Sequence, residues 1–309
     1  RWLGDWRKEE MTKSLLVVIL ASWLALPQLP QETPGLLVSA DWLSDHLIDP
    51  QVVILHADMQ KSRYEAGHIP GAHFLDMNQI VWEGDPAWGT EMRSLAEIND
   101  ALEMGGVSGG QHIVVYASNP LFAARVFMTL EVMGLRGSVS MLDGGFGGWQ
   151  EDGHEISMEI PTFNRGSISL AAQDDVLVTA DWIHQRLTDP RTALVDARPD
   201  DEYTGEDGGL GGTAHPGHIP GAAQMYWEEL VVSRQSPTVH DLDQLTELFV
   251  SAGAEEGDTV VAYCMVGWRA SFTYFTARLL GYETKFYDGS WRDWGTREDL
   301  PYVLGRSPR

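Results

Sequence analysis

The pattern of apolar and polar positions along the chain predicts an α/β fold. Short apolar runs rich in β-branched residues alternate with longer amphipathic stretches. Four of these runs lie at residues 52–55, 113–116, 193–196 and 259–262. Such runs are typical of strands in a parallel sheet that helices cover on both faces. We therefore expect mostly parallel sheets flanked by helices.

A helix is predicted directly after the fourth run, over residues 270–281. Its apolar face is formed by Phe272, Phe275, Thr276 and Leu279. Gly281 can take the left-handed conformation that ends a helix. The chain thus passes from a strand to a helix close to Arg269.

Three sequence landmarks occur twice, in the same order, about 145 residues apart. Residues 37–42 return as 177–182, Gly-His-Ile-Pro-Gly-Ala at 67–72 returns unchanged at 217–222, and 143–149 returns as 288–294. This period suits a duplicated globular domain rather than a solenoid repeat. We expect a signal peptide and spacer over 1–34, a first domain over 35–155, a linker over 156–175 and a second domain over 176–305.

Cys264, the only cysteine of the chain, lies between the fourth predicted strand and the predicted helix. A turn there aims backbone N–H groups and the positive end of the helix dipole at an anion, and a thiolate is such an anion. Gly267 gives the turn the required backbone freedom, and Arg269 adds positive charge. The alternative is a buried structural cysteine. In the first copy Ala117 stands in the place of Cys264, so that copy is predicted to be inactive.

With these repeats and the loop at 264–269, the chain resembles the tandem-domain rhodanese family of thiosulfate and 3-mercaptopyruvate sulfurtransferases. The resemblance covers nearly everything from Leu36 to Leu304. It implies two rhodanese-like domains, and a Cys264 thiolate that takes the outer sulfur of a donor as a persulfide and passes it to cyanide or a thiol. No metal and no cofactor are implied. Donor and acceptor are expected to be small molecules.

The resemblance also assigns substrate-binding residues. Backbone N–H groups from Met265, Val266, Gly267, Trp268 and Arg269 would cradle the persulfide, and Arg269 would hold an anionic donor. Arg198, in the family's Asp-Ala-Arg segment, is placed at the site, with a salt bridge to Asp196 or Asp200 as the alternative. Trp227 and Trp268 could line the pocket or be packed in the core.

The mercaptopyruvate enzymes usually carry Cys-Gly-Ser-Gly-Val-Thr in this loop, and Val266 stands where their serine assists proton handling. Thiosulfate is therefore the expected donor, with 3-mercaptopyruvate as the alternative. A sulfur-carrier or binding module that delivers sulfur to a partner protein is the other alternative.

Other classes fit less well. Cysteine phosphatases and arsenate reductases place five residues between Cys and Arg, whereas four separate Cys264 from Arg269. Neither copy has Gly-x-Gly-x-x-Gly after its first strand, which argues against a dehydrogenase. One cysteine and scattered histidines argue against a metal site. His68 and His218 share one motif in both copies, so a structural role is expected.

The net charge of −24, from 45 acidic and 21 basic residues, argues against nucleic-acid binding and against stable membrane association. It also repels an anionic donor, so we expect moderate salt to raise the donor's association rate. A monomer is expected.

Twelve mainly apolar residues at 15–26 follow Met11 and Lys13. They are too few for a membrane span and suit the apolar region of a signal peptide. We expect export to a bacterial periplasm, with a cytoplasmic location as the alternative. The proline-rich stretch 27–34 is expected to be a spacer.

Overall fold

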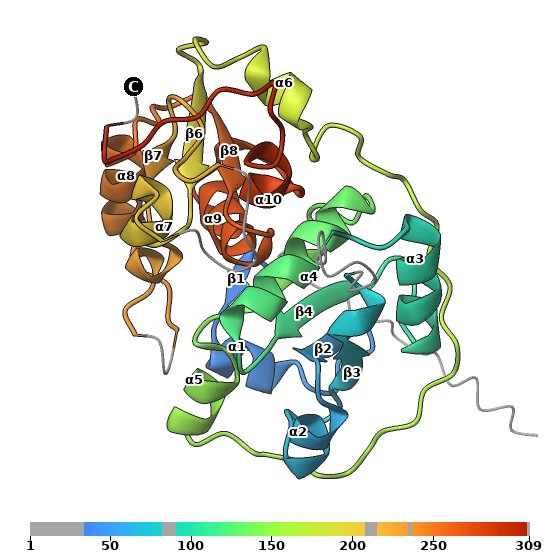
Figure 1. Cartoon of the computed structure of the whole chain (residues 1–309). Helices are drawn as coiled ribbons and strands as arrows, with labels where there is room; N and C mark the ends of the chain where they lie inside the picture. Colours follow the sequence, from blue (N-terminus) through green and yellow to red (C-terminus); the bar gives the residue numbers. More distant parts are fainter. Residues whose placement is uncertain (1–33, 82–90, 208–214, 234–236, 308–309) are drawn as a thin grey trace, which may run out of the picture. The chain divides into compact units, whose positions relative to one another are not determined.

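The computed structural model describes residues 34–81, 91–207, 215–233 and 237–307 (Figure 1). The predicted signal peptide and nearly all of the predicted spacer lie outside these residues. Within them the chain forms two α/β halves, each built on its own sheet. No helix of the described residues has both the length and the apolar character needed to cross a membrane.

The N-terminal half has a five-stranded sheet with the order β1-β5-β4-β2-β3, in which every neighbouring pair is parallel. Its strands are β1 (Leu37–Val38), β2 (Val52–Asp58), β3 (His73–Asp76), β4 (His112–Tyr116) and β5 (Val139–Leu142). Its helices are α1 (Ala40–Asp45), α2 (Lys61–Ala66), η1 (Met77–Gln79), α3 (Leu95–Met104), α4 (Pro120–Val132) and α5 (Gly145–Glu151).

The C-terminal half repeats this plan with a four-stranded parallel sheet of order β7-β6-β8-β9. Its strands are β6 (Thr192–Asp196), β7 (Ala223–Gln224), β8 (Thr259–Tyr263) and β9 (Glu283–Phe286). Its helices are α6 (Ala180–His184), α7 (Asp200–Thr204), η2 (Trp227–Leu230), α8 (Leu242–Ser251), α9 (Trp268–Leu279) and α10 (Ser290–Trp294). A parallel bridge from Leu177 to Phe286 takes the place that β1 has in the first sheet. The two tandem domains of the sequence prediction are therefore present.

Strand register fixes which residues of the two halves correspond. Leu55 pairs with His73 and Val195 pairs with Ala223, and both partners directly follow the repeated Gly-His-Ile-Pro-Gly-Ala motif. His56 therefore corresponds to Asp196. Ala117 follows β4 as Cys264 follows β8, which matches the correspondence expected from sequence.

The two histidines of the repeated motif make the same contacts in both halves. His68 Nδ1 lies 2.8 Å from the carbonyl oxygen of Tyr64, and His218 Nδ1 lies 2.9 Å from that of Tyr203. Each imidazole stacks on its tyrosine, with ring centroids 3.9 and 3.7 Å apart. The shared contacts agree with the structural role expected for this motif.

Helices α4 and α9 pack against each other between the two sheets (Figure 1). Phe127 of α4 meets Phe275 of α9 edge to face, with centroids 5.0 Å apart. Every residue of α9 from Ala270 to Ala277 is buried. The prediction of a single apolar face for this helix was incomplete, because α4 of the other half covers the side that an isolated domain would leave in water.

The segment over residues 158–175 contains no helix or strand. It follows the N-terminal half, since the backbone N–H of Gly166 donates to the carbonyl of Glu103 at 2.8 Å and that of Ala171 donates to Met133 at 3.2 Å. Phe163 stacks on His73. These contacts hold the connection between the halves against the first of them.

Candidate active site

The loop that carries Cys264 joins the carboxyl end of β8 to the first turn of α9. Gly267 is the N-cap of α9 and has a φ of 92°, in the left-handed region that favours glycine. A Cβ atom at this position would lie 2.8 Å from Nη1 of Arg125. Glycine is therefore required here both by the backbone conformation and by the close approach of Arg125.

The sulfur of Cys264 is held by its own loop. The backbone N–H of Gly267 donates to Sγ over 3.1 Å, so the start of α9 presents a donor to the position where a thiolate forms. The backbone N–H of Cys264 donates to Oγ of Ser290 over 3.2 Å, and the N–H of Trp291 donates to the carbonyl of Cys264 over 2.8 Å. The start of α10 thus fixes the backbone that carries the sulfur.

A cavity of about 350 Å³ opens onto Cys264 and takes its walls from both halves of the chain. The C-terminal half contributes Glu202, Cys264, Met265, Val266, Trp268 and Arg269. The N-terminal half contributes Met59, Asn119, Leu121 and Phe122. The rings of Phe122 and Trp268 meet across the boundary with centroids 5.2 Å apart and an angle of 57° between their planes. Cys264 has an exposed fraction of 0 %, and the cavity formed by these described residues gives a reactant access to its loop.

Arg269 is paired with Glu202 of α7 inside the cavity. Nη1 and Nη2 of Arg269 donate to Oε1 and Oε2 of Glu202, each over 2.8 Å. Burial alone would lower the pKa of Arg269, but the hydrogen bonds to Glu202 and the negative charges of Cys264 and Glu202 outweigh burial and raise it. The guanidinium stays charged, and a carboxylate already occupies two of its donor groups.

Behind the loop, Arg125 of α4 reaches across from the N-terminal half. Its Nη2 lies 2.6 Å from Oδ1 of Asp288, and Oδ2 of the same aspartate accepts a hydrogen bond from the backbone N–H of Met92 over 2.9 Å. The reciprocal contact is present as well, because the N–H of Val239 donates to Oδ1 of Asp143 over 2.9 Å. Each half therefore supports the aspartate of the other half's repeated Asp-Gly motif.

The family follows from comparison with known proteins. The family model described as Rhodanese-like domain matches residues 39–152 and matches again over residues 179–297. The chain belongs to the rhodanese family. Both rhodanese domains found by this comparison coincide with the two sheets described above.

Relatives of this rhodanese differ in their names. The chain is 32% identical over 284 residues to the sulfur carrier protein TtuD of Thermus thermophilus, covering 88% of this chain and 98% of the relative. It is 31% identical to a putative thiosulfate sulfurtransferase of Haloferax volcanii, covering 87% and 96%. The crystal structure of SseA from Escherichia coli, a 3-mercaptopyruvate sulfotransferase, is 28% identical with a TM-score of 0.73 and covers 84% of this chain and 99% of that one. Sulfurtransferase activity in general is supported, and the donor is not fixed by these relatives.

The structure brings most of the predicted site residues together. Cys264, Met265, Val266, Trp268 and Arg269 line one cavity, and Gly267 contacts the sulfur from within the loop. Trp268 is a wall of the pocket. Trp227 is instead buried against Phe272, with ring centroids 5.8 Å apart, and is a core residue of the rhodanese domain.

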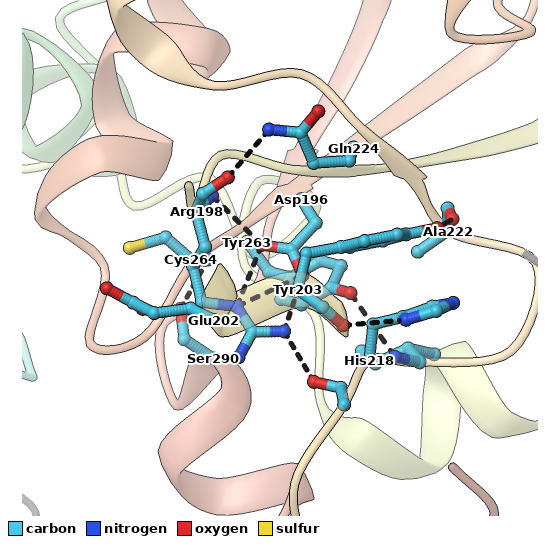
Figure 2. Close-up of polar contacts among 12 residues, drawn as sticks. Asp196, Arg198, Glu202, Tyr203, His218, Ala222, Gln224, Tyr263, Cys264 and Ser290 are labelled. Carbon is cyan, nitrogen blue, oxygen red and sulfur yellow. Dashed lines mark hydrogen bonds and ion pairs between the residues drawn. The ribbon is translucent and has the colours of Figure 1, made fainter. Parts of the chain in front are cut away.

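Arg198 does not reach the cavity, which corrects its placement at the site. Its exposed fraction is 1 %, and its guanidinium donates to Asp196 at 2.6 to 3.0 Å and to the carbonyl of Gly217 at 2.7 Å. In Figure 2 the sulfur of Cys264 points away from this pair, whereas the carboxylate of Glu202 lies on the side of the sulfur. The salt bridge with Asp196, left open as an alternative, is the contact that Arg198 makes.

Glu202 and the wall from the N-terminal domain were not predicted from the sequence. Glu202 follows Arg198 by four residues in the first turn of a short acidic helix, where a carboxylate normally faces water. Asn119 is the N-cap of α4 and Leu121 lies in the first turn of that helix, at positions of the first domain that correspond to the cysteine loop and the start of α9. The duplication could have indicated this wall, because two copies that pack through corresponding helices also bring their corresponding loops together.

Proposed function

We propose that this rhodanese is a thiosulfate sulfurtransferase. The Cys264 thiolate attacks the outer sulfur of thiosulfate, a new S–S bond forms as the donor's S–S bond breaks, and sulfite leaves with the electron pair. Cyanide or a thiolate then attacks the outer sulfur of the persulfide. Thiocyanate or a low-molecular-weight persulfide leaves, and the Cys264 thiolate is restored.

The observation that carries this proposal is the position of the Cys264 sulfur. It accepts a hydrogen bond from the Gly267 N–H at the start of α9 and opens into a cavity that also holds a guanidinium. A persulfide anion on Cys264 would lie at the positive end of the α9 dipole, beside the same N–H donor. The curated relatives that share this architecture include a putative thiosulfate sulfurtransferase.

The loop composition supports thiosulfate as the donor. Val266 has no hydroxyl that could move a proton for 3-mercaptopyruvate, whereas thiosulfate needs no proton to release sulfite. Glu202 accepts hydrogen bonds from Nη1 and Nη2 of Arg269, and the guanidinium has further N–H groups that can hydrogen-bond an anionic substrate at the cavity.

A sulfur-carrier role is the second candidate, because a relative at 32% identity over 88% of this chain is named a sulfur carrier protein. A protein acceptor would have to insert a thiol or a chain end into the cavity, since Cys264 has no exposed surface outside it. This geometry favours small acceptors over a folded partner.

The test is release of sulfite and thiocyanate from thiosulfate and cyanide, with 3-mercaptopyruvate as the second donor and Cys264→Ser as the matched variant. We expect turnover with thiosulfate that falls to background in the variant, and a persulfide seen as the mass of one added sulfur atom in the wild type alone. Faster turnover with 3-mercaptopyruvate would replace the proposed donor. A persulfide that neither cyanide nor a small thiol discharges would favour the carrier role, and equal release by both proteins would refute the proposal.

A further inference from the structure

Arg125 lies behind the Cys264 loop, although it belongs to the domain that has no cysteine. Its exposed fraction is 1 %, and its Nη2 pairs with Oδ1 of Asp288 over 2.6 Å. The guanidinium lies over the ring of Phe286, with Cζ 5.2 Å from the ring centroid. A Cβ atom added at Gly267 would lie 2.8 Å from Nη1 of Arg125 and 3.3 Å from Oδ1 of Asp288. The Gly267 turn therefore rests directly on this ion pair.

Stability alone does not account for a cation at this place. The start of α9 is the positive end of the helix dipole, and it repels a positive side chain beside it. A buried ion pair, moreover, is often no more stable than apolar residues of similar volume. A persulfide on Cys264 reverses this balance, because the helix start and Nη1 of Arg125, the atom of the pair nearest to the Gly267 turn, would both attract the anion.

The duplication allows Arg125 to be compared with a corresponding residue. Helices α4 and α9 begin at corresponding N-caps, Asn119 and Gly267. Eight residues after these caps come Phe127 and Phe275, whose rings meet edge to face with centroids 5.0 Å apart. Residues at equal distances from the two caps therefore occupy equivalent places at the contact between the domains.

Arg125 and Thr273 form such a pair, since each comes six residues after its N-cap. Both side chains are buried. Arg125 extends from the cysteine-free domain to the Cys264 loop, where it lies against Gly267. Thr273, its counterpart in the catalytic domain, is short and uncharged. The guanidinium is thus supplied in one direction, from the domain without a cysteine to the domain with one.

We propose that Arg125 of the cysteine-free domain is a positioning residue for sulfur transfer at Cys264. The inference rests on the proposed function, because it concerns the same persulfide. Arg125 is not among the described residues that line the cavity, so it acts through Gly267, whose N–H donates to the sulfur over 3.1 Å. It holds this N–H on the sulfur while a new S–S bond forms at Cys264, the S–S bond of thiosulfate breaks, and sulfite leaves with the electron pair.

The experiment follows persulfide formation from thiosulfate by rapid mixing and protein mass in the wild type, Arg125→Met and Arg125→Lys. We expect Arg125→Met to lower the limiting rate at saturating thiosulfate by about tenfold or more, because a small displacement of the reacting sulfur is costly. The thiosulfate concentration that gives half of this rate should stay unchanged, since Arg125 does not line the cavity. Arg125→Lys keeps the charge and should recover part of the rate.

Glu131→Gln is the matched control. Glu131 is buried on the same helix as Arg125 and also pairs with a residue of the other domain, but its partner Arg278 lies in the last turn of α9, far along the helix from the Gly267 turn. Glu131→Gln should lower stability toward urea and leave the limiting rate unchanged. Equal losses of rate in Glu131→Gln and Arg125→Met would show that Arg125 only holds the two domains together, and would overturn the inference.

Arg125→Met leaves the Asp288 carboxylate without its guanidinium, so a double variant with Asp288→Asn removes both charges. The amide oxygen can still accept the hydrogen bond from the N–H of Met92, and loss of a whole buried pair often costs little stability. This variant should unfold at the temperature of the wild type and keep the low limiting rate. A wild-type rate in the double variant would overturn the inference, because the unpaired carboxylate would then have caused the loss.

The remaining outcomes separate this inference from the proposed function. A higher half-saturating thiosulfate concentration in Arg125→Met, with an unchanged limiting rate, would mean that Arg125 acts on donor binding and does not position the sulfur. If the wild type reacts with thiosulfate and Arg125→Met matches it, only the inference fails. If the wild type gains no sulfur atom by mass, the proposed function fails and the inference fails with it.

Discussion

His56 and Asp196 occupy corresponding positions in the two sheets and have opposite electrostatic roles. Asp196 carries the charge that holds Arg198. His56 instead places Nδ1 3.1 Å from the hydroxyl of Tyr116, and burial lowers the pKa of His56 to about 4, against the opposing influence of the Asp58 carboxylate. The first domain therefore keeps a neutral imidazole where the second domain keeps an ion pair.

This contrast predicts an acid-sensitive N-terminal domain. The folded-state pKa of His56 lies below its unfolded value of 6.5, so the unfolded chain binds the proton more readily between the two values. The stability that neutral His56 contributes is complete above pH 6.5 and is lost as pH falls toward 4, by about 3 kcal/mol. Urea unfolding of the wild type and His56→Gln at a series of pH values measures this loss of the free energy of unfolding.

The control for this series is His184→Gln, since His184 lies exposed on α6. His56→Gln should flatten the pH dependence below pH 6.5, while His184→Gln should follow the wild type. Parallel curves for the wild type and His56→Gln would show that His56 does not couple protonation to folding.

The residue scale also shows what the sequence could and could not predict. Cys264, Gly267 and Arg269 form a contiguous pattern whose spacing already indicates a loop around a sulfur, and the structure places them together. The spacing of Arg198 and Glu202 could not predict which of the two side chains lies at the cavity. Which of them faces the cavity depends on the direction of two side chains four residues apart, and Asp196 decides it by holding Arg198.

At the scale of elements, the contact between α4 and α9 is fixed by one buried carboxylate. Glu131 of α4 accepts hydrogen bonds from the hydroxyl of Tyr274 over 2.6 Å and from Nε and Nη2 of Arg278 over 2.9 and 3.0 Å. Its side chain is 1 % exposed. Tyr274 and Arg278 belong to α9, whereas Arg136 of the N-terminal half lies 3.8 Å from Oε2 of Glu131, so the two domains share this cluster.

We expect Glu131→Gln to lower the free energy of unfolding by about 3 kcal/mol, because it leaves Arg278 partly buried without its counter-charge. Chemical denaturation of the full chain measures the loss. The same substitution at Glu97, which pairs with Arg93 at the surface of α3, should change stability little. Similar losses at the two positions would contradict the assignment of a special role to the buried cluster.

The strands were the most predictable elements. All four apolar runs found in the sequence are strands, β2, β4, β6 and β8. Helices cover each of these strands on both faces, and a nearly continuous apolar run is the composition that such burial requires. The environment of α9 was less predictable. Its second buried side depends on a helix 143 residues away in sequence, as the Tyr274–Glu131 contact shows. The pattern of apolar residues within α9 does not indicate such a partner.

At the scale of the whole molecule, the net charge of −24 opposes the approach of any anionic donor. Both arginines that the sequence placed at the site are paired with carboxylates, Arg269 with Glu202 and Arg198 with Asp196. Local positive potential is therefore small, and the repulsion of the whole molecule dominates the encounter.

We expect the second-order rate of persulfide formation with thiosulfate to rise a few-fold as ionic strength increases from about 10 to 150 mM, because the Debye length shortens from about 30 to 8 Å. Stopped-flow measurements with sodium chloride as the added salt test this. Methanethiosulfonate, with a single charge, should show a smaller rise. A steep fall in rate with added salt would mean that Arg269 attracts the donor in spite of Glu202.

The cavity that opens onto Cys264 takes one wall from each domain, and residues 156–175 join those domains in one chain. Two separate single-domain proteins would complete such a pocket only above the dissociation constant of their complex. Tethering replaces that bimolecular equilibrium with an effective concentration of about a millimolar or more. The assembled pocket consequently does not depend on how dilute the protein is, so specific activity should stay constant on dilution.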